Sequence, residues 1–388
     1  MTYTLLHSSV LLSGTGPNPW GPPAIAILSD GTFLVASEIQ DTLESVRLWH
    51  LADDLSVLGS TDIAMGASDR PTPYLVATGM HAVLITRVAF SPATYATYLV
   101  DATGPNPSVG PAVWQSTSVK PAYEQAVMFH VYDLVTNRIV ILSDGNSPSC
   151  SVLQVFDSTT GALLSEAVAI GSSGYPVGLY MNPADHTKFA GYDASPQRLN
   201  FTVALDGSSC FYDGITTIVG GGAYSGAVGS PYIPGGPGLI AESFSPVLGV
   251  NFYAADGSVS ASYAMVGSEY VNLFGPSVTL ADSSLILYLE LANAADASAF
   301  DGFLIAVDQS VVPATMEHLS LPYPVSGYSY VFDIAHMDVD QSTGIILIGA
   351  MLYDFGAGLV SSVLWVVQGP VMTPNLTGQL LEDRVRFT

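Results

Sequence analysis

Short runs of apolar residues separated by turn residues fill the whole chain, and residues 151–170, SVLQVFDSTTGALLSEAVAI, show this pattern most clearly. The first run is apolar and ends at Asp157, a Ser-Thr-Thr-Gly turn follows, and a half-polar run begins at Ala162. Val, Leu and Phe favour a pleated strand, Gly161 suits a turn position with positive φ, and Asp157 can accept hydrogen bonds from the amides of its own turn. The segment therefore predicts a β-hairpin.

A strand of this kind recurs along the chain at intervals of 48 to 60 residues, which gives seven repeats. The residues that end these strands are Asp53, Asp101, Asp157, Asp206, Asp256, Asp308 and Gln368. A second hairpin precedes each of them, with turns near Asp30-Gly31, Gly79, Thr136-Asn137, Asp185, Gly235-Gly236, Asp282-Ser283 and Ser342–Gly344. Each repeat opens at a Pro or Gly, namely Pro23, Pro73, Pro121, Pro176, Pro231, Pro276 and Gly327. The three landmarks keep the same spacing, so each repeat is expected to hold four strands.

Seven repeats of four strands predict an all-β fold, a single seven-bladed β-propeller of four-stranded antiparallel blades that spans residues 1–369. The blades are expected at residues 20–63, 70–118, 121–171, 174–220, 229–267, 270–321 and 325–369. Residues 3–12 read as an outer strand that completes the seventh blade and closes the ring. Residues 370–388 are then a C-terminal tail carrying Arg384 and Arg386. This tail is expected either to supply a substitute closing strand or to dock on an acidic neighbouring subunit.

Strand composition favours blades that pack face to face, because inner strands buried on both sides read as continuous apolar runs. Residues 285–289, 345–348 and 363–367 have this composition, whereas residues 165–168 and 258–263 mix polar and apolar residues as outer strands do. A β-sandwich would lack the fifty-residue repeat, and a β-helix would have a much shorter one.

The overall composition requires a large buried surface. Hydrophobic residues make up 49% of the 388 residues, charged residues make up 11%, and the mean hydropathy is +0.41. The longest apolar run, residues 345–353, is about half of the roughly 18 to 20 residues that a membrane-spanning helix needs. We therefore expect burial between sheets and no membrane insertion. With 37 Gly, 25 Pro and no long helical spacing, helix should be nearly absent.

The formal net charge of −24, from 33 acidic and 9 basic residues, disfavours nucleic acid and anionic membranes as partners. Solubility of an apolar chain explains this charge, and a saline environment or a cationic partner would also fit it. Cys150 and Cys210 are too few for a disulfide framework or a zinc site, so we expect two buried thiols.

The N-terminus has no basic region ahead of its short apolar stretch, so it does not resemble a signal peptide. The chain nevertheless has only two Lys and is rich in Ser, Thr, Gly and Ala, as proteins that work outside a cell are. A virion component fits both observations, and so does a secreted protein whose signal has been cut away. We therefore expect a virion or extracellular location.

Residues 155–164, VFDSTTGALL, resemble the strand-turn-strand of quinoprotein-type and YVTN-type propeller repeats, in which an aromatic residue and Asp precede a Thr-Gly turn. Residues 131–142 and 337–348 are similar to it. The resemblance implies the propeller architecture for the whole chain and the motif for these three segments. The Trp-Asp dipeptide of WD repeats and the regular tryptophan of quinoprotein repeats are missing, so the resemblance implies no cofactor and no activity.

Acidic residues in loops are the first candidates for chemistry. The loops after the second and fourth strand of each blade are expected to share one face, where propeller enzymes place catalysis. That loop face would hold Glu38, Asp41, Glu44, Asp69, Glu124, Asp193, Glu269, Asp296, Asp301 and Asp354. A glycosidase needs two carboxylates roughly 5 to 10 Å apart, and the sequence brings no pair together. Residues 29–33, SDGTF, are only a fragment of a sialidase-type Asp box.

The sequence contains no complete set of metal ligands at a recognisable spacing. The seven histidines show no HxH or HExxH spacing, and His50, His130 and His336 lie in expected strands, as core residues do. Residues 338–344 present oxygens at alternate positions like the start of a calcium loop, but the closing Glu is missing and an ordinary hairpin turn fits equally. We therefore assign no catalytic, cofactor-binding or metal residues, and calcium remains a weak alternative.

Tyrosines are more suggestive, because exposed Tyr beside Ser, Gly and Asn suits carbohydrate stacking and protein interfaces, although packing at strand ends explains it equally. The tyrosines at loops and strand ends are Tyr74, Tyr95, Tyr98, Tyr175, Tyr232, Tyr270, Tyr323, Tyr328, Tyr330 and Tyr353. Asn200 and Asn375 begin glycosylation sequons, which arise often by chance.

These features together favour a non-enzymatic structural or adhesive propeller. We expect a phage-tail, capsid-associated or other extracellular assembly component that binds assembly proteins or a host glycan through its loop face. The alternative is a secreted carbohydrate-active enzyme, a lyase or glycosidase on a propeller scaffold. A third hypothesis, an intracellular scaffold, would require a stable cytosolic partner.

Overall fold

The structure analysed is a computed structural model of the chain. It describes residues 3–14, 23–39, 45–64, 73–90, 93–116, 128–133, 135–145, 150–171, 176–182, 185–193, 197–217, 227–229, 237–243, 249–254, 259–264, 271–272, 277–279, 285–292, 301–308, 315–322, 330–340, 342–354, 359–369, 371 and 386–387.

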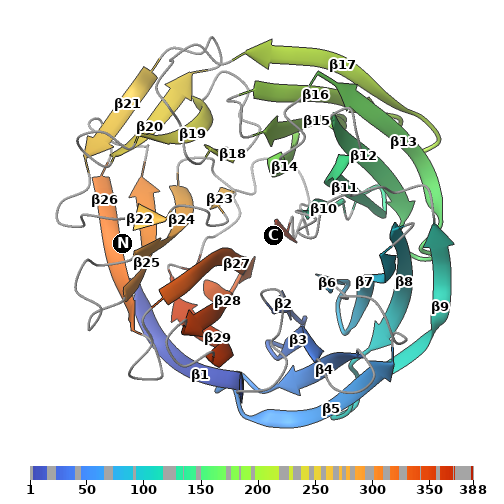
Figure 1. The fold of residues 1–388 in the computed structure, drawn as a ribbon, viewed down its shortest axis with the longest axis vertical. Coiled ribbons are helices and arrows are strands. Elements are labelled where there is room, and N and C mark those ends of the chain that lie inside the picture. The colour runs from blue at the N-terminus through green and yellow to red at the C-terminus, as the bar shows by residue number, and fades with distance from the viewer. Residues whose placement is uncertain are drawn as a thin grey trace. The chain divides into compact units, whose positions relative to one another are not determined.

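Strands provide all the regular secondary structure of these residues, and they form seven antiparallel sheets (Figure 1). Most sheets consist of four strands that follow one another in the chain. The protein is therefore all-β, a seven-bladed β-propeller, as the repeat predicts. The described part of the chain contains no helix long and apolar enough to cross a membrane.

The chain divides into two compact units, of which the first comprises Met1–Lys120, Leu291–Ile305 and Glu317–Thr373. Its first sheet has the order β2-β3-β4-β5, its second β6-β7-β8-β9, and the seventh β1-β29-β28-β27. The first sheet consists of β2 (Ala24–Ile27), β3 (Phe33–Ile39), β4 (Ser45–Leu51) and β5 (Val57–Ala64). The second consists of β6 (Tyr74–Ala77), β7 (His81–Phe90), β8 (Ala93–Asp101) and β9 (Ser108–Ser116). The seventh consists of β1 (Thr4–Gly14), β27 (Tyr330–Asp340), β28 (Ile345–Asp354) and β29 (Leu359–Gln368).

The second unit comprises Pro121–Glu290, Ala306–Met316 and Pro374–Thr388. The third sheet consists of β10 (Met128–Asp133), β11 (Arg138–Gly145), β12 (Cys150–Asp157), β13 (Leu163–Ile170) and β30 (Arg386–Phe387). The fourth consists of β14 (Pro176–Asn182), β15 (Asp185–Asp193), β16 (Gln197–Val203) and β17 (Cys210–Thr217). The fifth consists of β18 (Ala227–Gly229), β19 (Pro237–Ser243), β20 (Gly249–Ala254) and β21 (Val259–Ala264). The sixth sheet, whose residues are divided between the two units, consists of β22 (Val271–Asn272), β23 (Ser277–Thr279), β24 (Leu285–Ala292), β25 (Asp301–Asp308) and β26 (Thr315–Pro322).

The N-terminal strand completes the last sheet, as predicted. Strand β1 pairs antiparallel with β29 over its whole length, from Thr4 opposite Gln368 to Gly14 opposite Val360. The C-terminal strand β30 pairs instead with β10, where Phe387 lies opposite Val131. The outer place in the seventh sheet therefore belongs to the N-terminus, and the tail does not supply the closing strand.

One type of hairpin turn recurs in both units. Its Asp carboxylate accepts a hydrogen bond of 2.8 to 3.0 Å from the amide of the Ser or Thr two residues later. The pairs are Asp30 and Thr32, Asp54 and Ser56, Asp101 and Thr103, Asp157 and Thr159, Asp185 and Thr187, Asp206 and Ser208, and Asp340 and Ser342. The predicted roles of Asp157 and Gly161 are confirmed, since Asp157 also accepts from the Thr160 amide and Gly161 has a φ of +68°. A carboxylate that takes a turn's free amides favours the turn over other local conformations.

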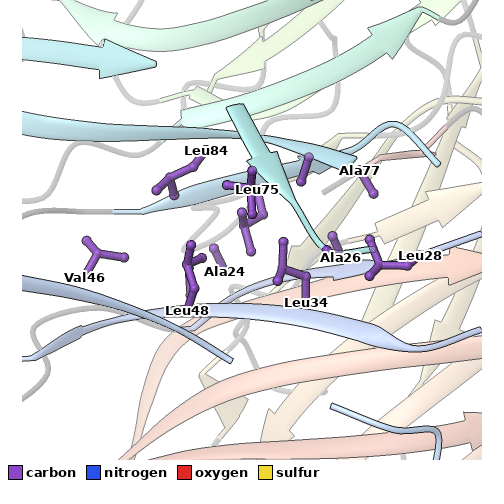
Figure 2. Packing of buried hydrophobic residues seen from close by; sticks show 13 residues of the cluster. Ala24, Ala26, Leu28, Leu34, Val46, Leu48, Leu75, Ala77 and Leu84 are labelled. Carbon is purple, nitrogen blue, oxygen red and sulfur yellow. The ribbon is translucent and has the colours of Figure 1, made fainter. Parts of the chain in front are cut away.

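The core lies between neighbouring sheets and uses both faces of the inner strands. In β2, Ala24 and Ala26 pack in the cluster shared with the second sheet, whereas Ile25 and Ile27 pack with the seventh sheet. Figure 2 shows the first of these clusters, in which Leu75 and Leu84 lie opposite Leu34 and Leu48 of the first sheet. The prediction that continuous apolar runs mark strands buried on both faces is confirmed for residues 346–348 and 363–367, which are at most 1% exposed, whereas the side chains of residues 285–289 lie outside the described structure. Removing a buried Leu or Ile side chain from such a core typically costs about 2 to 5 kcal/mol.

Candidate functional site

The ten predicted loop-face acids are described only in part. Glu38 lies within β3 and is buried at 3% exposure, whereas a position in a loop was expected. Asp193 ends β15, Asp301 begins β25 and Asp354 ends β28, but their side chains lie outside the described structure. The remaining six, Asp41, Glu44, Asp69, Glu124, Glu269 and Asp296, lie outside the described residues altogether.

The possible calcium ligands bind the protein's own backbone. Asp338 accepts hydrogen bonds from the amides of Ile27, at 2.8 Å, and Val339, at 2.9 Å. Asp340 accepts from the amide and hydroxyl of Ser342 within the turn between β27 and β28. The two carboxylates therefore serve different contacts, and Asp340 and Ser342 belong to the hairpin turn that the spacing also allowed. No group of three or more His, Cys, Asp or Glu within the described structure could hold a metal ion.

Two of the three strand histidines are described, and both are held by their surroundings. His50 is buried, its Nδ1 donates to the Gly104 carbonyl at 2.9 Å, and its Nε2 lies 2.9 Å from Thr32 Oγ1. The His336 ring packs 5.7 Å from the Tyr74 ring, and desolvation by burial lowers the pKa of His336 to about 4. The expectation of core histidines is confirmed for His50, while the side chain of His130 lies outside the description.

Packing also accounts for Tyr74, Tyr98 and the two thiols, whose side chains the structure describes. Tyr74 is buried, and burial raises the pKa of the half-buried Tyr98. Cys150 and Cys210 are unpaired by any disulfide, and Cys150 is buried as expected. Burial and the neighbouring Asp213 raise the pKa of the partly buried Cys210 to about 12. The side chains of the other eight predicted tyrosines lie outside the description.

A buried charged cluster joins the third and fourth sheets, and no sequence pattern singled it out. Arg138, 1% exposed, donates through Nη2 to Asp133 Oδ2 at 3.1 Å and through Nε to Thr136 Oγ1 at 2.5 Å. It also donates to the backbone carbonyls of Ala204 and, at 2.9 Å, His186. These last two hydrogen bonds connect the guanidinium of Arg138, on β11 of the third sheet, to the backbone of the fourth sheet.

The acidic member of this cluster is Asp133, which is completely buried. Its Oδ1 lies 2.8 Å from Nδ1 of His186, and the Thr136 hydroxyl donates to its Oδ2. Burial by itself would raise the pKa of Asp133, but the hydrogen bonds from Thr136 and Arg138 together with His186 outweigh burial and lower the pKa. A buried carboxylate held in this way stays ionised at neutral pH.

Similar hydrogen bonds join other neighbouring sheets within each unit. Between the first and second sheets, His50 binds Gly104 and the Thr61 hydroxyl donates to the Pro107 carbonyl at 2.5 Å. Between the third and fourth, the Ser165 hydroxyl donates to the Gly207 carbonyl at 2.6 Å. In both cases the last turn of one sheet is bound by the third or fourth strand of the sheet before it.

The fourth sheet differs from the first, third and seventh in the exposure of its third strand. Third strands β4 and β12 are buried at nearly every residue. In β16, buried and half-buried residues alternate instead, so one face of this strand is less covered than the other. Leu199, Phe201 and Val203 pack into the core shared with the third sheet. Asn200 and Thr202 therefore point to the opposite face.

That opposite face carries a connected set of polar side chains from three strands. Lys188 Nζ of β15 donates to Thr202 Oγ1 at 2.5 Å and lies 3.7 Å from Asp213 Oδ2 of β17. The Thr202 hydroxyl in turn donates to Asp213 Oδ2. Asn200 Nδ2 donates to the Gly214 carbonyl at 3.2 Å and to Thr216 Oγ1 at 3.1 Å.

An exposed aromatic ring completes this surface. Phe211 is 60% exposed and lies directly opposite Thr202 in the pairing of β16 with β17. Its neighbours in sequence, Cys210 and Tyr212, pack against the core on the other side, so Phe211 shares the polar face. We call this surface the Asn200 face and define it as Lys188, Asn200, Thr202, Phe211, Asp213 and Thr216. It includes the sequon at Asn200, which lies within a paired strand and whose amide is hydrogen-bonded.

Comparisons with known proteins add little beyond the class of fold. No protein-family profile matches the chain, and no curated protein matches its sequence. A candidate 6-phosphogluconolactonase from Bacteroides fragilis is 14% identical, with 78% of this chain and 85% of that chain covered and a TM-score of 0.49. One from Bacteroides uniformis is 13% identical, with 77% and 85% covered and a TM-score of 0.47. The WD40 domain of SCAP from fission yeast is 10% identical, with 94% and 98% covered and a TM-score of 0.39. Likenesses this distant carry no functional argument, and the assignment to the β-propeller class depends on the seven sheets and their strand order.

Proposed function

We propose that this protein is a non-enzymatic binding scaffold, a structural or adhesive component of a virion or another extracellular assembly. Its role is to hold a recognition surface in a fixed position toward a partner protein or a host glycan. The low content of Lys, the acidic composition and the propeller architecture all suit this role.

The observation that carries the proposal is the use of polar side chains to fasten one sheet to the next. Asp133, Arg138 and His186 connect the third sheet to the fourth, and His50 and Thr61 connect the first to the second. Hydrogen bonds between packed elements restrict their relative movement, and rigid elements hold a binding surface with little loss of conformational entropy on association. These side chains therefore keep neighbouring sheets in fixed positions, as a scaffold requires.

The test is to offer the purified full chain an immobilised array of extracellular glycans and, in parallel, to incubate it with neutral and acidic polysaccharides. The proposal expects retention on the array without release of any product from the polysaccharides. Product release that disappears on replacing one loop-face acid, for example Asp301→Asn, would instead establish the carbohydrate-active enzyme. A chain that neither binds the array nor assembles with virion or extracellular proteins would also overturn the proposal.

A further inference from the structure

We propose that the Asn200 face is a binding site for a neutral glycan. This inference deepens the proposed scaffold function, since it names the ligand class and the residues that meet it. It starts from an unusual exposure: the third strand of the fourth sheet presents alternate polar side chains where β4 and β12 are almost fully buried.

The register of the sheet gathers the face into one surface. Thr202 lies opposite Phe211 and Asn200 opposite Gly214, and the pairing shifts between Asn200 and Phe201. This irregularity leaves Asp213 as an extra residue of β17, and its carboxylate is bound to the Thr202 hydroxyl on the polar side. Gly214 makes the shift possible, because its φ of +124° lies in a region that other residues rarely adopt.

The internal hydrogen bonds of the face leave donors and acceptors for a ligand. Asn200 uses its Nδ2 for Gly214 and Thr216, which leaves its Oδ1 as an acceptor. Thr216 accepts that bond and keeps its own hydroxyl proton, while Asp213 is bound through Oδ2 and keeps Oδ1. Acceptors and a donor at fixed positions match the vicinal hydroxyl groups of a sugar, each of which both donates and accepts.

The aromatic ring beside these groups suits the same ligand. Phe211 is 60% exposed, and it is the residue of the face with no polar atom in its side chain. A flat apolar surface next to hydrogen-bonding groups is what a pyranose ring requires, because the ring has apolar C–H faces and a polar edge. A partner protein would be expected to meet a more apolar patch, since aromatic and aliphatic residues fill the centres of protein interfaces.

Charge separates a neutral glycan from an acidic one. Lys188 and Asp213 have opposite charges and lie 3.7 Å apart, so these two residues together contribute no net charge. The chain as a whole carries −24 and would repel a uronate or sulfate polymer at long range. A neutral polyhydroxylated chain would not be repelled.

The other side of the sheet holds the face in place. Leu199, Phe201 and Val203 are fully buried against the third sheet, and Arg138 binds backbone carbonyls of the fourth sheet. The side chains of the Asn200 face thus project from a strand whose other side is packed in the core, so ligand binding should cost little conformational entropy.

The experiment titrates the full chain calorimetrically with maltohexaose, cellohexaose, mannohexaose, xylohexaose and chitohexaose, and with tetragalacturonate as the anionic comparator. We expect at least one neutral hexaose to bind and tetragalacturonate to bind more weakly. Phe211→Ala should weaken binding about tenfold, and Thr216→Val, which keeps the side-chain shape, about fivefold. The matched control Ile170→Ala removes an apolar side chain, 74% exposed on the outer strand of the third sheet, and should change affinity less than about twofold.

Three calorimetric results would overturn the inference: no binding of any neutral hexaose, tighter binding of tetragalacturonate, or an effect of Ile170→Ala equal to that of Phe211→Ala. Unfolding curves of each variant identify a loss of binding that comes from misfolding, and Thr216→Val keeps the test valid if Phe211→Ala is unstable. If the array in the preceding experiment retains the protein and Phe211→Ala leaves that retention unchanged, this site is wrong and the scaffold function stands. Release of product would contradict the scaffold function itself.

Discussion

Replacing Arg138 by Met tests whether the buried cluster joins the third and fourth sheets. Met keeps most of the aliphatic stem that packs by Gly207, but it removes the guanidinium that lies over the Phe189 ring. The change leaves the fully buried Asp133 without its cationic partner, and the carbonyls of Ala204 and His186 without their donor. Breaking a buried ion pair from one side costs about 3 to 5 kcal/mol, so we expect a loss of this size in the free energy of unfolding.

Urea denaturation followed by circular dichroism measures this loss, and a double-mutant cycle assigns it to the ion pair. Asp133→Asn removes the stranded charge, so the double variant should be more stable than the sum of the two single losses by about 1 to 3 kcal/mol. Arg47→Met is the matched control, because Arg47 pairs with Asp62 at 2.5 Å while both side chains are over one third exposed. Exposed pairs contribute about 0.2 to 1 kcal/mol. A loss for Arg138→Met no larger than for Arg47→Met, or strict additivity in the cycle, would refute the role given to the cluster.

Acidification should lower the free energy of unfolding through Asp133, because the pKa of this carboxyl is lower in the folded than in the unfolded protein. Its stabilisation is fully present above the unfolded pKa, near 4, and is lost as the pH falls through the folded pKa. Asp133→Asn should therefore make the urea midpoint less dependent on pH below about pH 4. Gly59→Ala should destabilise by about 1 to 3 kcal/mol, because a Cβ there would clash with the Pro105 carbonyl oxygen; a normal melting temperature would contradict this close contact. Cys210, whose pKa is about 12, should react with a thiol reagent at pH 8 only after unfolding, and rapid reaction of the native protein at this position would show that burial is misjudged. Asp157→Ala removes the acceptor of two turn amides and should cost about 1 kcal/mol in urea, whereas a loss below a few tenths would mean that the turn holds itself.

The sequence was sufficient for the fold because its signals repeat. An Asp followed two residues later by Ser or Thr marks hairpin turns throughout the chain, and the run from Ile345 to Ile348 signals a strand buried on both faces. The N-terminal strand could be placed by elimination, since the seventh repeat lacked an outer strand. Local patterns of this kind are consistent with the global fold, so they can be interpreted without tertiary information.

The candidate site was not predictable in the same way, because its members come from different strands. Arg138 and His186 are 48 residues apart, and nothing in the alternation of either segment links them. For the Asn200 face a usable signal did exist: the polar residues Arg198, Asn200 and Thr202 alternate with apolar residues in a third strand, whereas residues 363–367 in the third strand of the seventh repeat are continuously apolar. That alternation identifies a wet face but not its partners, since Asp213 reaches Thr202 only through a shifted register.

Hydrogen–deuterium exchange of the full chain, with and without the neutral hexaose that binds best, tests most directly whether this protein is a scaffold that presents the Asn200 face to a glycan. We expect slower exchange of the amides of β16 and β17 on binding, with the exchange rates of the amides in the first and second sheets unchanged. Protection confined to the predicted loop face, or equal protection with Phe211→Ala, would contradict it.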